Sequence, residues 1–462
     1  MIEKSIEGSF RDPSGYVYFL DGIIHRVVNK CYKEDYDHLF KSGLYEILTK
    51  KNYLIKHEEK NIEASSNSEY YKKIIPTNIP FISYPYEWSF SQLKDAALLT
   101  LEVQLLALKH DMVLKDASAY NVQFKDNKPI FIDTLSFERI KEDKPWQAYQ
   151  QFCQHFLAPL SLMSKRDVRL SQLLKLYIDG IPLDLASKLL PFKTYLSFGI
   201  LSHLHLHAMF QTHYSNNKKS IKEIKKIKQI DIINICKSLK NIITKLHWKP
   251  HGTEWISYYS SNNNYEVDTM QFKEKFVYEN IKKISPNLVW DFGANTGYFS
   301  RLSSNLGFRT VSFDIDPACV EINYLEMRDK NETNLLPLYL DLTNPSPAIG
   351  WGNTERTSLY ERNTPQLIMA LALIHHLVIS DNIPLIKIAE LFFKLSPYLI
   401  IEFVSREDTM VKKLLSSKKN DFDEYNKDNF EKIFKKSYNI ISSKKILNSE
   451  RTMYFMERIE KA

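Results

Sequence analysis

Hydrophobic and polar residues follow three different patterns along the chain of 462 residues. Residues 1–165 combine short β-rich runs with a segment, 93–110, that has the periodicity of an amphipathic helix. Residues 166–250 are helical in pattern and have little strand character. From residue 251 onward, apolar runs of strand length alternate with helical stretches, which predicts βαβ units and a parallel sheet.

The apolar runs of this last part end in polar residues. The ends lie at Asp291, Asp314 and Asp341, near His375, and at Glu402. Because the carboxyl ends of parallel strands meet at one edge of a sheet, and ligands bind there, we expect these side chains to surround one site. Two further runs, 438–441 and 452–456, predict a closing pair of strands.

These patterns predict a fold of the α/β class and three parts. A first domain covers 1–215, a lysine-rich helical linker covers 216–250, and an α/β domain with a mostly parallel sheet and helices on both faces covers 251–462. Within the linker, isoleucines recur at three-residue spacing between lysines, which is typical of a helix with one solvated face.

Composition excludes several classes of protein. Only 12 residues are glycine, whereas an average protein contains roughly 7%. The chain has neither G-x-G-x-x-G nor G-x-x-x-x-G-K-[ST], which excludes a P-loop NTPase and an ordinary dinucleotide-binding fingerprint. The net charge is +7, but 13 of the 62 cationic residues are arginine. Since phosphate recognition relies on the arginine fork, this lysine excess argues against a nucleic-acid binder.

Cysteine usage and hydropathy indicate a cytoplasmic protein. The 4 cysteines form no C-x-x-C pair, so we expect neither a disulfide framework nor a zinc site. The first residues contain no apolar signal core. The longest apolar run, 367–379, is shorter than the roughly 20 residues that span a bilayer, so we expect no membrane span.

The most specific motif is Asp291-Phe-Gly-Ala-Asn-Thr-Gly297. A strand ends in a carboxylate, turns on two glycines and opens a helix, so that a ligand can approach the backbone closely. Asp314 follows about 20 residues later, where a carboxylate accepts two hydrogen bonds from a ribose. A site with aspartates and no phosphate loop suits S-adenosylmethionine, which carries a ribose and a sulfonium. The alternative is that the aspartates only cap turns and helices.

On these residues, 255–462 resemble the class I S-adenosylmethionine-dependent methyltransferases. The resemblance implies an enzyme with a Rossmann-like fold and a cofactor site, in which Asn295 stands where the family usually has glycine. The cofactor-binding residues that it implies are Asp291, Gly293, Asn295, Gly297, Asp314, Ile315, Asp341 and Leu342. Lys273 or Lys275 could reach the methionine carboxylate, or each could be a solvated surface lysine.

His375 and His376 are the candidate catalytic residues. At the end of the fourth strand, an imidazole could take a proton from an attacking hydroxyl. The alternative is a pair of half-buried histidines that shape the turn, and Glu402 is a weaker candidate. The N/D-P-P-[YFW] turn of adenine-type amino methyltransferases is absent. We therefore expect methylation of a hydroxyl or carbon on a small-molecule or carbohydrate-like acceptor, with no resident metal.

A second constellation lies at Asp116, Asn121 and Asp133. It resembles the catalytic segment of protein-kinase-like phosphotransferases, which implies a kinase-like α+β domain over 1–215 and Mg-ATP at these three residues. Arg26 could occupy the position of the strand lysine. Because Thr134-Leu135 replaces the usual Phe-Gly and no glycine-rich loop is present, we expect a degenerate domain.

Two rival functions stay open at this stage. One is a bifunctional kinase and methyltransferase that modifies a glycan, and the other is a non-enzymatic adaptor with two relic sites. The two-part arrangement is similar to that of methyltransferases among nodulation-related proteins, and no pattern indicates an oligomeric state. The histidines at 203, 205, 207 and 213 could include a metal pair, His203 and His207, but the absence of acidic partners favours core histidines.

Overall fold

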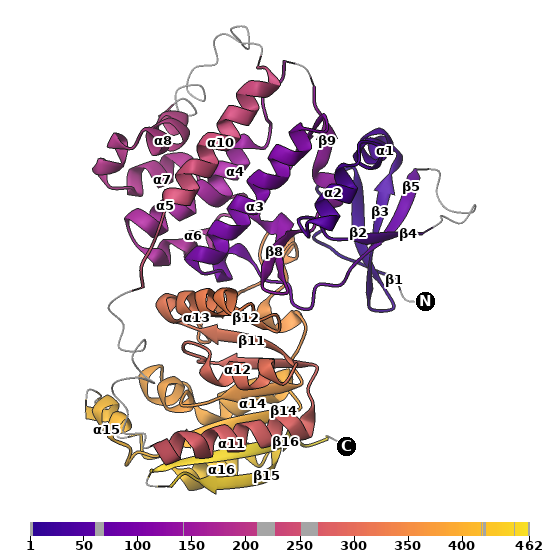
Figure 1. Cartoon of the computed structure of the whole chain (residues 1–462). Coiled ribbons are helices and arrows are strands. Elements are labelled where there is room, and N and C mark those ends of the chain that lie inside the picture. Colours follow the sequence, from indigo (N-terminus) through magenta and orange to yellow (C-terminus); the bar gives the residue numbers. More distant parts are fainter. Residues whose placement is uncertain are drawn as a thin grey trace. The chain divides into compact units, whose positions relative to one another are not determined.

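The chain forms two compact units. The computed structural model describes residues 3–60, 69–141, 143–209, 227–250, 267–416, 418, 422–447 and 449–460. One unit comprises Met1–Lys249 together with Pro347–Thr357, and the other comprises Pro250–Ser346 and Ser358–Ala462 (Figure 1). None of the helices in the described residues is long and apolar enough to cross a bilayer.

The N-terminal unit begins with an antiparallel sheet of five strands in the order β1-β2-β3-β5-β4. In that order the strands are β1 (Glu3–Ser5), β2 (Gly15–Leu20), β3 (Ile23–Asn29), β5 (Tyr70–Pro76) and β4 (His57–Lys60). A two-residue Asp21-Gly22 turn joins β2 to β3, and both residues have positive φ, as a tight hairpin requires.

The rest of this unit is mainly helical. Its helices are α1 (Lys33–Lys41), α2 (Leu44–Lys50), α3 (Phe90–Leu108), α4 (Tyr149–Phe152), α5 (Ala158–Lys165), α6 (Leu173–Leu176), α7 (Leu183–Leu189), α8 (Phe198–Ile200) and α10 (Gln229–Lys245). The segment after α3 forms two small pairs of antiparallel strands. They are β6 (Met112–Leu114) with β9 (Phe137–Arg139), and β7 (Val122–Lys125) with β8 (Lys128–Phe131).

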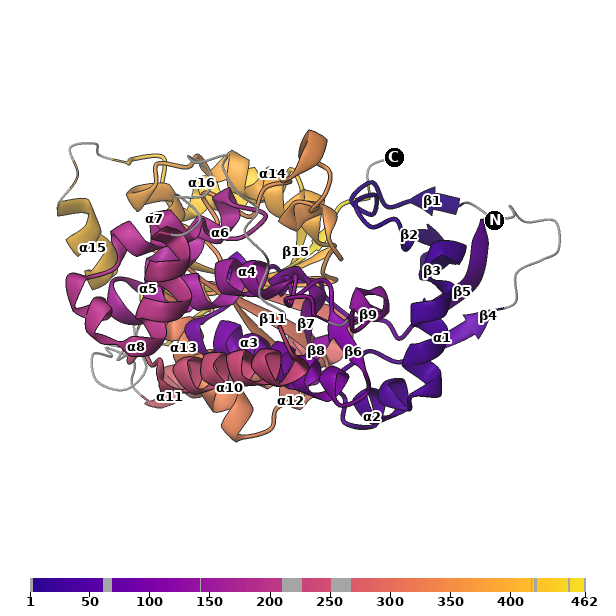
Figure 2. The same ribbon diagram turned by 90° about the horizontal axis from the view of Figure 1, so that it is seen from above.

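Helix α10 packs against α3 and belongs to this unit (Figure 2). The ammonium of Lys94 on α3 donates to the carbonyls of Thr244 and Leu246 at 2.9 and 2.8 Å, which satisfies the carboxyl end of α10. The unit therefore extends to Lys249, beyond the boundary that the sequence predicts at residue 215. Residues 216–226 of the predicted linker lie outside the described residues.

The C-terminal unit contains a sheet of seven strands in the order β12-β11-β10-β13-β14-β16-β15. In that order the strands are β12 (Leu335–Tyr339), β11 (Arg309–Asp314), β10 (Leu288–Phe292), β13 (Leu367–Ala370), β14 (Tyr398–Val404), β16 (Arg451–Arg458) and β15 (Tyr438–Lys445). The first five are parallel, and β16 and β15 are antiparallel. The predicted Rossmann-like sheet and its closing pair of strands are confirmed.

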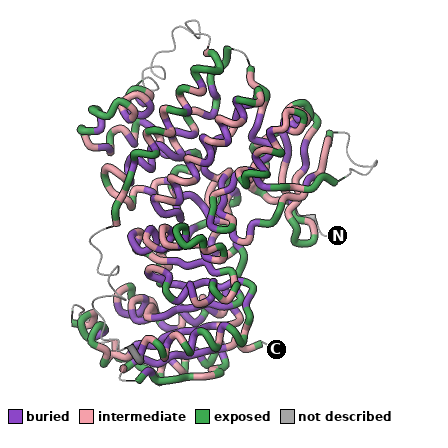
Figure 3. Tube along the Cα trace, viewed as in Figure 1, coloured by how far each residue is buried: buried purple, intermediate pink, exposed green. Residues whose placement is uncertain are grey.

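Helices cover both faces of this sheet. The α-helices described in this unit are α11 (Val267–Ile284), α12 (Tyr298–Asn305), α13 (Pro317–Asp329), α14 (Leu385–Leu395), α15 (Thr409–Ser416) and α16 (Lys427–Phe434), of which α15 packs on the short helix His376–Ser380. Alternate residues of β10 face opposite sides: Val289 packs in the core with residues of α11, and Phe292 stacks on Phe392 of α14. The central strands β10, β13 and β14 are buried on both sides for almost all of their length, whereas the edge strand β15 is mostly exposed (Figure 3).

Strand order changes direction between β10 and β13. From β10 the chain proceeds outward through β11 to β12, then returns to β13 on the other side of β10. In such sheets, ligands bind beyond the carboxyl ends of the strands at this switch point. β13 ends at Ala370, five residues before His375, and Ala372 between them has a φ of +49°.

Candidate cofactor and acceptor site

The loop after β10 depends on backbone conformations that few residues adopt. Gly293, Asn295 and Gly297 have φ values of +70°, +53° and +82°. Asparagine is among the few residues other than glycine that enter the left-handed region readily, which explains why Asn295 can stand in this turn. A Cβ atom at Gly297 would lie 2.4 Å from the side-chain oxygen of Asn323, so this position has no room for another residue.

Hydrogen bonds tie this loop to the end of the neighbouring strand. The backbone N–H groups of Gly293 and Ala294 both donate to the carbonyl of Phe313, at 2.9 and 3.0 Å. The N–H of Asn295 donates to Asp314 Oδ2 at 2.7 Å. The loop is thus preorganised, and it places the first motif beside the aspartate that ends β11.

Asp291 links the strand before the loop to the helix after it. Its side chain is buried and accepts a hydrogen bond of 2.5 Å from the Ser300 hydroxyl on α12. Burial raises the pKa of Asp291 to about 7, the Ser300 hydroxyl opposes that shift, and the nearby Asp314 charge adds to it. Asp291 and Gly297 do not line the pocket described below, whereas Gly293, Asn295, Asp314 and Ile315 do.

Asp314 faces the pocket as an acceptor. Its Oδ1 accepts from the N–H of Asp316 at 2.8 Å, and its Oδ2 accepts from Asn295. Burial raises the pKa of Asp314 to about 6, although both N–H groups favour the charged carboxylate. The neighbouring Ile315 is 57% exposed, so its side chain can cover a ligand held by Asp314.

A cavity of about 280 Å³ lies over the switch point. Apolar side chains from four strand ends form much of its wall, and three acidic side chains lie among them. Its lining residues are Phe292, Gly293, Asn295, Phe313, Asp314, Ile315, Leu340, Asp341, Leu342, Thr343, Leu371, Ala372, Leu373, His376, Leu377, Ser380 and Asp381. The pocket therefore brings together seven of the predicted residues, all except Asp291, Gly297 and His375.

Asp341 and Asp381 form the acidic part of this pocket. Asp341 Oδ1 accepts from the N–H and the hydroxyl of Thr343, at 2.8 and 2.6 Å, so this aspartate also shapes its own turn. Burial raises the pKa of Asp381, and the Asp341 charge contributes to that shift. Asp381 is not among the predicted site residues, because no motif marks it and it follows the end of β13 by eleven residues.

The two candidate catalytic histidines differ in position. His376 lines the pocket, whereas His375 is 3% exposed and its Nδ1 has no hydrogen-bond partner among the described residues. Burial lowers the pKa of His376 to about 4, and the Arg451 charge adds to the shift. Burial also holds the pKa of His375 well below its usual value. Both rings are therefore neutral at pH 7.

Lys273 is a buried lysine and not a surface one. Its Nζ lies 2.7 Å from Oε2 of Glu402 and 5.1 Å from the centre of the Phe299 ring. Glu402 also pairs with Arg451, at 3.5 Å. Burial acts to raise the pKa of Glu402, but the charges of Lys273 and Arg451 outweigh it and lower the pKa. Lys275 points outward and pairs with Glu279 of its own helix.

In the N-terminal unit, the second constellation does come together. Asn121 donates from its side chain to Asp116 and also, at 3.2 Å, to the Ser136 hydroxyl. The Ser136 hydroxyl in turn donates to Asp133 Oδ2 at 2.9 Å. The other oxygen of Asp133 is paired with Arg26 of β3. Arg26, the residue that the sequence offers for the strand-lysine position, therefore occupies the carboxylate that a metal would need.

The histidines near residue 205 are satisfied within the helical part. His203 contacts the hydroxyl of Tyr149 at 2.8 Å through Nδ1 and that of Ser238 at 2.9 Å through Nε2. The His207 ring stacks on Tyr149, and His213 lies outside the described residues. In the described part of the chain, no group of three or more acidic, histidine or cysteine side chains could hold a metal ion.

The sequence of the chain was compared with protein-family models and with curated proteins. No family model matches it. The nodulation protein NoeA of Rhizobium meliloti (strain 1021) is 30% identical over 461 residues, which cover 98% of this chain and 96% of that protein.

Among solved structures, the chain is similar to three with low sequence identity. Magnesium protoporphyrin IX methyltransferase from Synechocystis PCC 6803, with bound SAH, is 14% identical with a TM-score of 0.32, over 44% of this chain and 91% of that one. The N-methyltransferase NodS from Bradyrhizobium japonicum WM9 is 10% identical with a TM-score of 0.31, over 42% and 99%. The bifunctional kinase-methyltransferase WbdD is 14% identical with a TM-score of 0.29, over 47% and 45%.

The family assignment rests on the first of these relatives, because its similarity extends over nearly the whole of both chains. The chain's first motif, its switch point and the pocket all lie in the C-terminal unit. The chain belongs to the family of the nodulation protein NoeA, and its C-terminal unit has a Rossmann-like sheet with a pocket at the switch point.

Proposed function

We propose that this enzyme transfers the methyl group of S-adenosylmethionine to a hydroxyl or carbon of a small-molecule or carbohydrate-like acceptor. The observation that carries the proposal is the pocket at the switch point. There the first-motif loop, the aspartate ending β11 and the carboxyl end of β13 surround one cavity. Its apolar walls suit an adenine ring, and its acidic side chains suit a ligand with positive charge and no phosphate.

Each predicted cofactor residue has a role that its position supports. Asp314 accepts hydrogen bonds from the ribose hydroxyls, and Ile315 covers the adenosyl group. Asp341 and Leu342 lie on the wall where the adenine fits, next to Leu340. Gly293 lets the ligand approach the backbone, and Asp291 and Gly297 hold the loop without lining the pocket.

The acceptor side lies at the end of β13. S-adenosylmethionine supplies an electrophilic methyl group, and the chain's residues align the acceptor with it. A new bond forms between the acceptor atom and the methyl carbon, while the carbon–sulfur bond breaks and its electron pair stays on sulfur. For a hydroxyl acceptor, the released proton passes to the neutral His376 ring or to solvent. Because alignment supplies much of the acceleration in such a transfer, His375 acts by packing behind His376.

For the N-terminal unit, we infer a kinase-like fold whose catalytic site is degenerate. An antiparallel five-stranded sheet precedes α3, and the Asp116–Asn121 segment follows that helix. Phosphotransfer as a second activity gains no support from the described residues, since Asp133 is already bonded to Arg26, Leu135 and Ser136.

Two measurements test the proposed function. Isothermal calorimetry should detect S-adenosylmethionine binding to the wild-type chain, and the absence of binding would contradict the proposal. Extracts supplied with purified protein and methyl-labelled cofactor should then yield a labelled small molecule or glycan in mass spectrometry. A label found only on protein or nucleic acid would contradict the acceptor class.

A further inference from the structure

Residues 347–357 lie between β12 and β13 in the sequence, within the methyltransferase half of the chain. In the structure they belong to the compact N-terminal unit. We call these residues the docked segment. Its two ends meet at an antiparallel bridge between Ile349 and Arg356, with a short turn at Trp351–Asn353 between them. It is thus a small closed loop held by residues far away in the sequence.

The main anchor of the docked segment is an ion pair between Glu355 and Arg11. The Nη2 atom of Arg11 lies 2.7 Å from Glu355 Oε1, and its Nε lies 3.1 Å from both carboxylate oxygens. The Glu355 side chain is 2% exposed, and its Oε1 also accepts from the N–H of Trp351 at 2.9 Å. Burial acts to raise the pKa of Glu355, but the Arg11 hydrogen bonds outweigh burial and lower the pKa.

Two glycines allow this close approach. A Cβ atom at Gly8 would lie 2.4 Å from the carbonyl oxygen of Glu355. Within the segment, a Cβ atom at Gly350 would lie 2.5 Å from Cβ of the same glutamate, and Gly350 has a φ of +89°. The chain contains only 12 glycines, and two of them lie at this one contact.

A second anchor engages the tyrosines around the kinase-like catalytic segment. The guanidinium carbon of Arg356 lies 4.3 Å above the centre of the Tyr120 ring, a cation–π geometry. The hydroxyl of Thr357 lies 3.2 Å from that of Tyr84. Tyr120 directly precedes Asn121 in the sequence, so this anchor uses a residue of the kinase-like catalytic segment.

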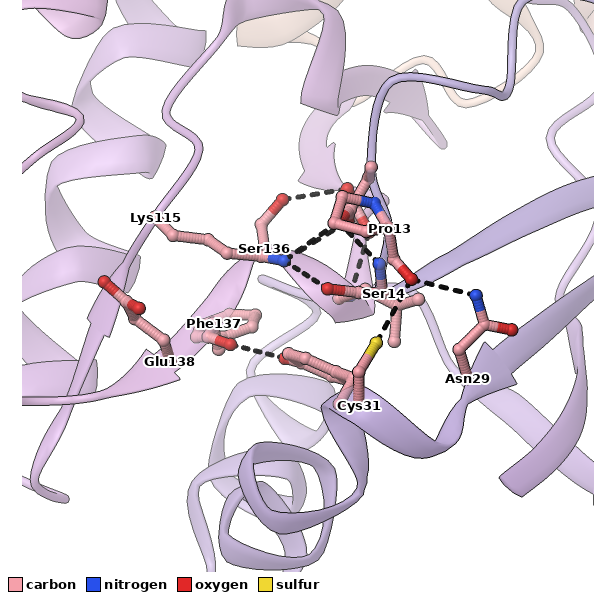
Figure 4. Close-up of polar contacts among 12 residues, drawn as sticks. Pro13, Ser14, Asn29, Cys31, Lys115, Ser136, Phe137 and Glu138 are labelled. Carbon is pink, nitrogen blue, oxygen red and sulfur yellow. Dashed lines mark hydrogen bonds and ion pairs between the residues drawn. The ribbon is translucent and has the colours of Figure 1, made fainter. Parts of the chain in front are cut away.

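The loop that carries Gly8 and Arg11 is itself fixed. Lys115 donates from Nζ to the Ser14 hydroxyl at 2.6 Å and pairs with Asp12 at 3.1 Å (Figure 4). The Pro13 carbonyl accepts from the side chain of Asn29 at 2.8 Å. The residue next to the predicted catalytic aspartate, Lys115, thus holds this loop, and the loop presents Arg11 to the docked segment.

We propose that the N-terminal unit is an internal docking module whose partner is the docked segment of the same chain, and that docking restrains the β12–β13 connection of the methyltransferase. The first residues of that connection, Asp341 to Thr343, line the cofactor pocket and precede the docked segment by a few residues. Anchoring a connection removes part of the conformational freedom that cofactor binding must otherwise take away. The effect on the cofactor rests on the proposed function, whereas docking itself does not.

The test combines hydrogen exchange with calorimetry on the full chain. Arg11→Ala and Arg356→Ala each remove one anchor. The matched control is Arg169→Ala, which removes an exposed arginine of the same unit whose carboxylate partner is two residues away. In the variant lacking both anchors, we expect faster exchange in 347–357 and S-adenosylmethionine binding weakened on the order of tenfold. The control should match the wild type in both readouts.

The outcomes separate the parts of the proposal. Unchanged exchange in 347–357 when both anchors are removed would overturn docking. Faster exchange with wild-type cofactor affinity would overturn the restraint on the methyltransferase. If the wild-type chain binds no S-adenosylmethionine, the proposed function and the restraint both fail, while the exchange readout still decides whether the N-terminal unit is a docking module.

Discussion

The ammonium of Lys273 and the carboxylate of Glu402 form an ion pair with 2.7 Å between Nζ and Oε2, and both side chains are almost completely buried. The pair joins α11 to the carboxyl end of β14, and Arg451 contributes a second positive charge from β16. A buried ion pair adds little stability relative to apolar residues, but breaking one leaves an uncompensated charge. The cluster is therefore a sensitive point in the packing behind His375.

Replacing Glu402 by glutamine should destabilise the C-terminal unit by about 3–5 kcal/mol, because the buried Lys273 ammonium then faces a neutral amide in place of a carboxylate, while Arg451 keeps its pair with Asp408 at 2.8 Å. Thermal unfolding followed by circular dichroism measures this as a lower Tm. The matched control is Lys275→Met on the same helix, whose exposed side chain should change stability by no more than about 0.5 kcal/mol. Equal Tm values for the two variants would contradict the assigned role of the cluster.

Asp314→Asn should weaken S-adenosylmethionine binding by roughly 10- to 100-fold, the loss expected when hydrogen bonds to a charged acceptor are removed at about 1.5–3 kcal/mol. Calorimetry measures the affinity directly. Asp329→Asn is the control, since Asp329 is exposed at the end of α13. Binding that survives in the Asp314 variant would contradict the ribose assignment but not the pocket.

Cofactor binding should also depend on pH. Burial raises the pKa of Asp314 to about 6, so its carboxylate gains full charge only above that pH. A charged carboxylate is the better acceptor for ribose hydroxyls and attracts a sulfonium, so affinity should rise as pH increases from 5 to 7. Calorimetry across this range checks the trend. The rise should be absent in Asp314→Asn, and an identical rise in that variant would assign the titration to another group.

Asp291 should make the folded state less stable as pH rises. Its folded pKa of about 7 lies above the ordinary value of 3.8, so the folded chain holds a proton that the unfolded chain releases. Stability from this group is complete below about pH 4 and is lost as pH rises toward 7. Asp291→Asn cannot lose a proton, so its unfolding free energy relative to wild type should increase between pH 5 and pH 7.5. A constant difference across that range in urea denaturation would contradict the raised pKa.

His376→Asn should lower the rate of methyl transfer by about 100-fold, the lower end of what a positioned proton acceptor contributes, and should change cofactor affinity little. Because burial lowers the pKa of His376 to about 4, the wild-type kcat should show no titration near pH 6.5. His247→Asn, which alters an exposed histidine of the N-terminal unit, is the control. A kcat step near pH 6.5 would mean that the ring is more exposed than the structure shows.

The sequence alone determined the local parts of the C-terminal unit. Gly293, Asn295 and Gly297 could be predicted as site residues from the sequence, because a tight turn from strand to helix requires left-handed backbone within five residues. Asp314 was readable because strand and helix lengths set the distance to the next strand end. Parallel strands then bring such ends together by a general rule of sheets, so most of the pocket's polar residues followed from spacing.

Tertiary structure decided whatever depends on residues far apart in the chain. Lys273 looks like any helical lysine until β14 places Glu402 beside it, 129 residues away. Glu355 meets Arg11 across 344 residues, and no periodicity or motif encodes that contact. Ala372 and Asp381 line the pocket from the segment that follows β13, where no motif marks them. Local steric preferences act within a few residues and leave a pattern, whereas long-range pairing depends on how whole elements pack.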